Sequence, residues 1–186
     1  LSGEYTTNAL LFKIKYPNAK ITYMNFLEIE NAVLEGKVDA GVLIHESILT
    51  YDEKLEVEIE LWDIWQELAG KDLPLPLGGM CIRRSIPLHN AIEYENTLIK
   101  AVNVANSNKA ILSKMLIERD LIRVNSETLN KYLDLYANDD SIELSALQYK
   151  ALDKLYELGY KHGFYEQQIR SEDFLIPSEY KELRAN

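Results

Sequence analysis

The sequence contains one cysteine, Cys81, among 186 residues, and only five prolines and eight glycines. A single thiol excludes an internal disulfide framework and any zinc site built from several thiolates. Long hydrophobic runs are also missing, since none approaches the roughly 18 residues of a membrane-spanning helix. The hydrophobic share of 47% is ordinary for a globular protein, so we expect a folded chain.

Positive charge is scarce, because 20 basic residues face 30 acidic ones and the net charge is -10. An acidic surface without a Lys/Arg stripe repels phosphate backbones and anionic lipids, which argues against nucleic-acid or membrane partners. The histidines His45, His89 and His162 lie in separate segments without metal-ligand spacing, so no metal is expected. Motifs for nucleotides, serine hydrolysis and redox thiols are absent. No secretory signal opens the chain, and we expect a cytoplasmic protein.

The first half of the chain alternates between helical and strand-like patterns. Branched apolar composition or strict alternation predicts short strands at residues 21–24, 38–44, 55–61 and 80–84. Helical spacing of apolar residues occurs before the first of these strands, ending at Pro17, and between the strands at residues 26–35 and 63–69. This order is typical of a parallel α/β fold.

The second half is predicted to be helical, with stretches at about residues 91–105, 109–119, 127–136 and 144–162. Ser126 is a predicted cap of the third stretch, and Gly163 a predicted end of the last. We therefore predict two lobes. An α/β lobe with a parallel or mixed sheet takes residues 1–84, and a mainly helical part takes residues 85–186.

His45 is the leading candidate for chemistry. With Glu46 it follows the predicted strand at residues 38–44, and the carboxyl ends of strands in open α/β sheets line ligand crevices. An imidazole accepts a proton near neutral pH, so His45 is a candidate general base, with Glu46 able to orient its ring. A histidine that caps the next turn or packs in the core fits the same pattern.

Thr6 and Thr7 place two hydroxyls at the start of the first predicted helix, beside unpaired backbone N–H groups. Such a helix start binds a carboxylate, a phosphate or a sugar hydroxyl, and helix capping alone explains the same residues. Leu77 and Gly78 end a rigid proline-rich segment. There a flat apolar ligand can approach the backbone, or the chain simply turns.

Four segments together resemble one family: EYTTNALLF, VDAGVLIHES, LPLPLGG and YANDDSIEL. The sequence is similar to 1,4-dihydroxy-6-naphthoate synthase of the futalosine route to menaquinone, in a group that includes chorismate dehydratase and periplasmic-type solute-binding proteins. The resemblance implies a two-lobed, periplasmic-binding-protein-like fold of type II with the substrate between the lobes. Family members begin before the equivalent of Leu1, so we expect the N-terminal part of one lobe to lie outside this chain.

The resemblance also implies an activity on a small-molecule substrate. This is cleavage of cyclic dehypoxanthinyl futalosine to 1,4-dihydroxy-6-naphthoate, a lyase reaction without metal or organic cofactor. The resemblance implies a base, two ligand-binding hydroxyls and a leucine of the pocket wall, at His45, Thr6, Thr7 and Leu77. To these we add Glu46, as a carboxylate that supports His45, and Gly78, next to Leu77.

Two alternatives remain on the same scaffold, because a fold does not fix a function. One is a non-enzymatic solute-binding protein for a small carboxylate or aromatic ligand. The other is the sibling enzyme that dehydrates chorismate, against which the histidine of the IHES run argues.

Overall fold

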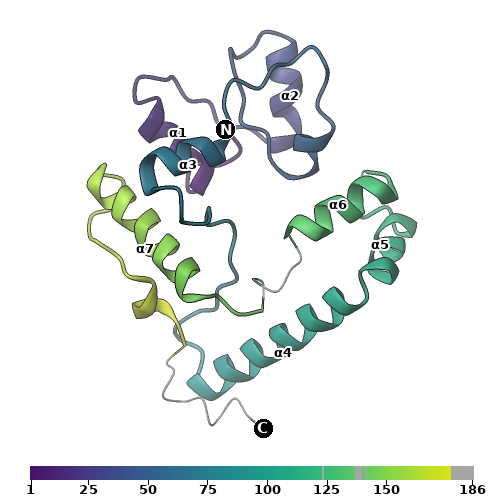
Figure 1. Ribbon diagram of the computed structural model, residues 1–186, viewed down its shortest axis with the longest axis vertical. Helices are drawn as coiled ribbons and strands as arrows, with labels where there is room; N and C mark the ends of the chain where they lie inside the picture. Colours follow the sequence, from purple (N-terminus) through teal and green to yellow (C-terminus); the bar gives the residue numbers. More distant parts are fainter. Residues whose placement is uncertain (123, 137–139, 141, 177–186) are drawn as a thin grey trace. The chain divides into compact units, whose positions relative to one another are not determined.

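The computed structural model describes residues 1–122, 124–136, 140 and 142–176, and leaves undescribed the side chains of Glu46, Leu135 and Tyr136. The YANDDSIEL segment lies partly outside these residues, and the tail after residue 176 lies wholly outside them. Every regular element in the described part is helical (Figure 1). In chain order these helices are α1 (Thr7–Lys15), α2 (Phe26–Leu34), η1 (His45–Leu49), α3 (Leu61–Ala69), α4 (Leu88–Ser107), α5 (Lys109–Glu118), α6 (Ser126–Tyr136), α7 (Ala146–Lys161) and η3 (Ser171–Phe174).

The predicted fold class, an α/β periplasmic-binding-protein-like fold, is wrong, since no described residue lies in a strand. A strand forms only where its backbone N–H and C=O groups pair with those of a neighbour. In the first predicted strand, Met24 N–H donates to Leu1 C=O (3.1 Å) and the Leu1 ammonium donates to Thr22 C=O (2.9 Å). Within the described residues, no ladder extends from this pair. In the second predicted strand Gly41 packs against α2 instead, whereas Met80 of the fourth is 82% exposed.

The third predicted strand shows how an alternating pattern is satisfied without a sheet. In an extended chain successive side chains point to opposite sides. Ile59 and Leu61 accordingly pack against the hydrophobic core of α1, α3 and α7. Val57, which alternates with glutamates in the same segment, remains 53% exposed. Val57 lies on the same side of the segment as Ile59 and Leu61, so only the end of this side next to α3 is buried.

Glycines end two helices, at Gly36 and at the predicted Gly163. After α2, Gly36 has φ +68° and donates to Val33 C=O (3.0 Å), and Lys37 N–H donates to Ala32 C=O (2.9 Å). After α7, Gly163 has φ +75° and donates to Tyr160 C=O (3.0 Å). These bonds to the last helical carbonyls need a left-handed residue after the helix, which glycine adopts without steric cost.

The start of α6 differs by one residue from the prediction. Ser126, the predicted cap, is instead the first residue of the helix. The side chain of Asn125 does the capping, because its Oδ1 accepts a hydrogen bond from Thr128 N–H (2.9 Å). Asparagine and serine are about equally good caps, so composition alone did not separate the two neighbours.

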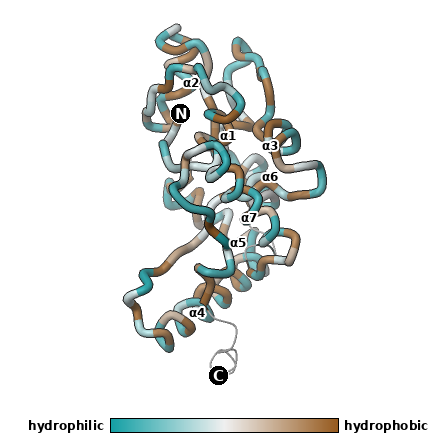
Figure 2. The backbone as a smooth tube through the Cα atoms, turned by 90° about the vertical axis from the view of Figure 1, so that its left-hand side faces the viewer, coloured by the Kyte–Doolittle hydropathy of each residue, from teal (hydrophilic) through white to brown (hydrophobic). Residues whose placement is uncertain are grey.

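The chain forms two compact units, which we describe separately. Unit 1 combines Leu1–Leu77 with Leu147–Arg170, and unit 2 combines Gly78–Ala146 with the residues from Ser171 on. Unit 1 thus includes α7, which the predicted division at residue 84 assigned to the other part. Hydrophobic and hydrophilic residues alternate along the helices of both units, as expected for helices with one buried side (Figure 2).

The core of unit 1 lies between α1, α3 and α7 (Figure 1). Trp65 of α3 is fully buried, and its indole N–H donates to Leu73 C=O at 2.8 Å, which satisfies the only polar atom of the side chain. The proline-rich segment is therefore tied to α3. The buried residues of this core are Leu10, Leu11, Ile64, Trp65, Ala151, Leu155 and Leu158.

Tyr165, which packs against this core, gives unit 1 a sensitivity to alkaline pH. Burial raises the pKa of Tyr165, and the neighbouring Tyr156 adds to the shift. The folded state therefore favours the neutral phenol. The resulting stability is present below the ordinary tyrosine pKa of about 10 and is lost as the pH rises through the folded-state pKa.

Between about pH 8 and pH 11, Tyr165→Phe should lose less stability in urea unfolding than wild type. Tyr5→Phe, at a position 96% exposed, is the control and should lose as much as wild type.

Unit 2 is built from α4, α5 and α6 with η3. The guanidinium of Arg84 donates to Asp173 C=O and lies over the Phe174 ring, 4.8 Å from its centroid, which fastens the segment before α4 to η3. Leu129 of α6 is fully buried. Among the described residues of either unit, no helix is both long and apolar enough to cross a lipid bilayer.

Candidate functional site

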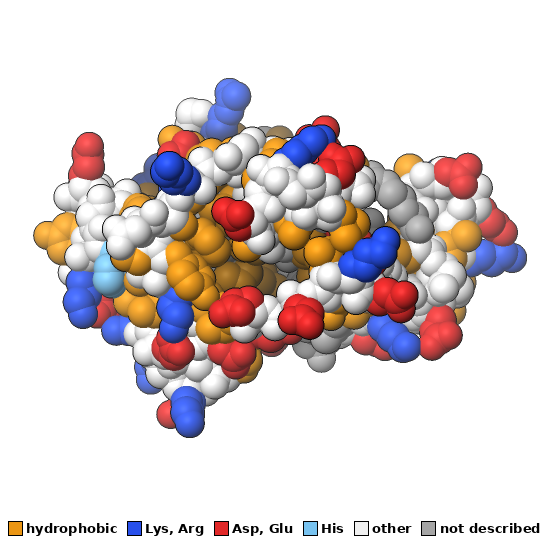
Figure 3. All heavy atoms as spheres, turned by 90° about the horizontal axis from the view of Figure 1, so that it is seen from above, with side chains coloured by type: hydrophobic (Ala, Val, Ile, Leu, Met, Phe, Trp, Pro, Cys, Tyr) orange, Lys and Arg blue, Asp and Glu red, His pale blue; other side chains and the backbone are white. Residues whose placement is uncertain are grey.

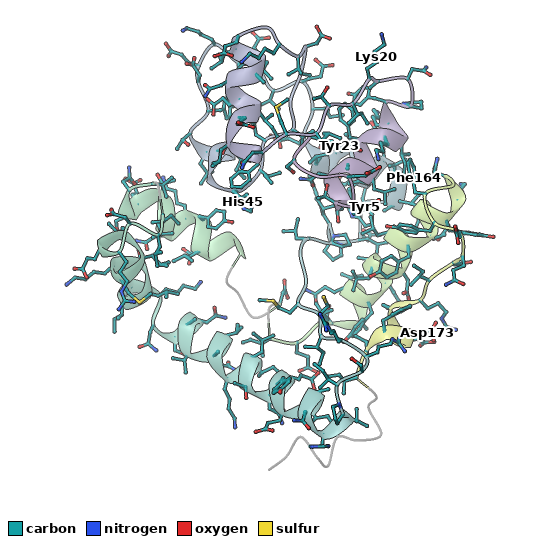
Figure 4. All side chains as sticks on the ribbon, turned by 180° about the vertical axis from the view of Figure 1, so that it is seen from behind. Tyr5, Lys20, Tyr23, His45, Phe164 and Asp173 are labelled. Atoms are coloured by element: carbon teal, nitrogen blue, oxygen red, sulfur yellow. The ribbon has the colours of Figure 1, made fainter. Side chains whose placement is uncertain are left out.

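His45 is the first residue of η1 and is exposed. Its φ is +59°, a left-handed conformation that is uncommon for residues other than glycine, although histidine adopts it more readily than most. The imidazole packs on the ring of Phe26, with 4.7 Å between centroids and 58° between planes. Figure 4 shows His45 at the N-terminal end of α2. The ring is thus supported by an aromatic neighbour while the residue stays accessible.

The segment that carries His45 is fastened along one face of α2. Phe26, Ile29, Glu30 and Val33 follow helical spacing and share that face. A Cβ on Gly41 would lie 2.4 Å from Ile29 Cγ2 and 3.1 Å from Val33 Cγ2, so only glycine allows this close approach. The sequence predicted α2 but not these contacts. The available signal was the spacing of Phe26, Ile29 and Val33 on one helix face, together with the later glycine, Gly41, that can approach this face closely.

A carboxylate holds the far end of the same segment. Glu30 Oε1 accepts a hydrogen bond from Asp52 N–H at 2.8 Å, across 22 residues of sequence. Asp52 Oδ1 in turn accepts from Lys54 N–H at 2.9 Å, which turns the chain away from α2. The turn η1, which begins with His45, therefore lies between Gly41 and Asp52, and both of these residues contact α2.

Thr6 is the N-cap of α1. Its Oγ1 accepts a hydrogen bond from Ala9 N–H (3.1 Å) and donates to Gly3 C=O (3.1 Å). A hydroxyl has one proton and two lone pairs, so one lone pair remains for a donor on a ligand. Thr7, the first residue of α1, is half-buried.

Removing the Thr6 hydroxyl should destabilise unit 1. Thr6→Ala leaves the N–H of Ala9 without its cap and is expected to cost about 1 kcal/mol in the free energy of unfolding. Thr6→Ser keeps the oxygen, and serine is at least as good a cap as threonine, so this variant should be as stable as wild type. Urea unfolding of the three proteins measures the difference. Equal stability of wild type and Thr6→Ala would show that the cap contributes nothing.

The remaining predicted site residues are distributed over the chain. Leu77 is 54% exposed and is the last residue of the first segment of unit 1. Gly78 begins unit 2, and a Cβ placed on it would meet no atom of the described residues within 4 Å. The side chain of Glu46 lies outside the described residues.

Basic and acidic side chains are mixed over the described surface. Figure 3 shows basic side chains scattered singly among acidic ones on one face of the molecule. Lys13 of α1 is engaged, since its Nζ lies 5.5 Å from the Tyr23 ring centroid and 5.8 Å from that of Phe164. Its Nζ also lies 3.9 Å from Glu4 Oε1. In the described part of the chain, no three potential ligands gather to hold a metal ion.

A family model described as menaquinone biosynthesis matches residues 1–161. The chain belongs to this menaquinone biosynthesis family. The chain is similar to a 1,4-dihydroxy-6-naphthoate synthase of Streptomyces coelicolor, with 28% identity over 157 residues, which cover 81% of this chain and 55% of that relative. The enzyme of the same name from Thermus thermophilus is 34% identical over 85 residues, or 45% of this chain and 30% of that relative.

The chain is also similar to a solved structure. A crystal structure of an Archaeoglobus fulgidus protein superimposes with a TM-score of 0.77 and 34% identity, covering 88% of this chain and 61% of that one. This chain therefore spans about half the length of the first curated relative and less than two thirds of the solved structure. The suspected family is thereby confirmed, whereas the individual site residues remain predictions.

Proposed function

We propose that this chain provides the base-carrying part of a cytoplasmic, cofactor-independent 1,4-dihydroxy-6-naphthoate synthase. The reaction is cleavage of cyclic dehypoxanthinyl futalosine in menaquinone biosynthesis. The observation that carries the proposal is the exposed imidazole of His45, packed on Phe26, in a chain of the menaquinone biosynthesis family. Both curated relatives that match the chain bear this enzyme name.

His45 is the general base in this proposal. A base must reach the proton that it removes, and an exposed imidazole meets that requirement. It takes an acidic proton from the bound substrate. The electron pair left behind becomes part of a new double bond and the carbon–carbon bond breaks as the bicycle becomes aromatic. The fragment that keeps the electron pair of the broken bond takes up the proton held by His45, so the cleavage is redox-neutral. Strained backbone conformations concentrate at functional sites, and the positive φ of His45 supports the same assignment.

The other predicted residues bind the substrate. The remaining lone pair of Thr6 Oγ1 accepts a hydrogen bond from a polar group of the sugar-derived part, beside the Thr7 hydroxyl. Leu77 and Gly78 offer an exposed apolar side chain and open backbone to the face of the bicycle. Glu46 supports the imidazole.

The proposal is tested by offering the natural protein two compounds in parallel, cyclic dehypoxanthinyl futalosine and chorismate. Calorimetry measures binding, and chromatography measures product. Formation of 1,4-dihydroxy-6-naphthoate from the first compound alone is the expected result. Tight binding of the first compound without any product would favour a solute-binding protein, and turnover of chorismate would favour the dehydratase.

A further inference from the structure

We infer that one face of α2 is the template that positions the His45 imidazole, and that Glu30 on this face is a positioning residue for the reaction. The inference rests on the proposed function. The face comprises Phe26, Ile29, Glu30 and Val33, and each of these residues contacts the segment that carries His45.

Before His45, the segment is held by backbone and close packing. Val38 N–H donates to Ala32 C=O (3.3 Å), which brings the chain back along α2 after its C-terminal turn. Gly41 then lies so near Ile29 and Val33 that a methyl group there would overlap their side chains. The approach of the chain to His45 is therefore fixed by contacts that allow little sliding along the helix.

After His45, the segment is held by the partly buried carboxylate of Glu30. A hydrogen bond from a backbone N–H to an ionised carboxylate is stronger than one between neutral groups. Since Asp52 follows η1 by three residues, this bond fixes the C-terminal end of the turn. Glu30 binds the backbone N–H of Asp52, and it acts on the imidazole through the backbone of this segment.

Between these two points, the imidazole rests on Phe26. A residue with φ +59° keeps that conformation only when its surroundings hold it, and the contacts on either side of His45 supply this restraint. Loosening one of them lets the turn relax and moves the ring. A displacement of about 1 Å of a reacting group can cost about 10²-fold in rate.

Glu30→Ala is expected to lower kcat for naphthoate formation about 10-fold and to leave KM within about two-fold, because the base moves while substrate binding stays. Glu30→Gln keeps a carbonyl oxygen at the position of Oε1 and should recover most of kcat. Glu28→Ala removes an exposed carboxylate from the same helix and is the matched control, expected to behave as wild type. Circular dichroism verifies folding, and Glu30→Asp replaces the alanine variant if that variant does not fold.

A second measurement follows the imidazole directly. The Phe26 ring shifts the NMR resonances of the His45 ring protons, and Phe26→Leu identifies that shift by removing it. We expect Glu30→Ala to reduce the shift and Glu30→Gln and Glu28→Ala to preserve it. Equal kcat and equal His45 resonances in Glu30→Ala and Glu28→Ala would overturn the inference. Normal turnover by His45→Asn would overturn the proposed function instead, while the resonances would still report whether Glu30 positions the ring.

Discussion

Replacement of His45 by asparagine is expected to lower kcat for naphthoate formation by about 10² to 10⁴. Asparagine is similar in size and can accept a hydrogen bond, but it cannot take up a proton near neutral pH. KM should change by less than about three-fold, since the base acts in the transition state rather than in substrate binding. Initial rates at several substrate concentrations measure both constants.

The control for this prediction is His89→Asn. His89 is exposed in α4 of unit 2 and has no role in the proposed site, so its replacement should leave kcat unchanged. A general effect of losing an exposed imidazole would appear in both variants. If His45→Asn retained the wild-type kcat, another group would have to be the base.

Replacement of Gly159 by alanine should destabilise unit 1, although alanine is the better helix former. Gly159 lies inside α7 and is buried. In an open helix, changing glycine to alanine gains about 1 kcal/mol. Here the new Cβ would lie 2.2, 2.5 and 2.8 Å from three atoms of the Tyr165 ring, which packs against the hydrophobic core. Overpacking of this kind costs about 1–3 kcal/mol, so after the helix gain of about 1 kcal/mol we expect a net loss of up to about 2 kcal/mol.

The cause can be isolated with a second substitution. In a Tyr165→Ala background the ring is absent, so Gly159→Ala should become neutral or stabilising by up to about 1 kcal/mol. Gly79→Ala is the control, because a Cβ there would meet no atom within 4 Å. Urea unfolding of these variants gives the comparison. Destabilisation by Gly159→Ala that persists without the Tyr165 ring would place the conflict elsewhere.

The helices were predictable because their signals are local. Spacing of apolar residues, Pro17 and the glycines after α2 and α7 identified helices within a few residues of their observed ends. The strands were not predictable in the same way, because a strand depends on a partner that may lie anywhere in a chain. Val38 to Ile44 has the composition of a strand, yet Gly41 of this segment lies against α2 instead.

Sequence reasoning identified the candidate site residues by type but not by their contacts. The position of Thr6 at the start of a predicted helix indicated a helix cap, and its hydroxyl oxygen accepts the capping hydrogen bond from Ala9 N–H. By contrast, nothing near Glu30 in sequence indicates that its carboxylate accepts a hydrogen bond from Asp52 N–H. A contact across 22 residues is set by the fold, so only the structure reveals which side chains hold His45 in place.

The most direct test of the account is genetic. A bacterial strain that depends on menaquinone and lacks its own 1,4-dihydroxy-6-naphthoate synthase receives the natural gene for this protein, or the same gene encoding His45→Asn, and its menaquinone content is measured. The account predicts that the wild-type gene restores menaquinone, that the variant does not, and that added 1,4-dihydroxy-6-naphthoate rescues both strains. Restoration of menaquinone by the His45→Asn gene to the wild-type level would contradict it.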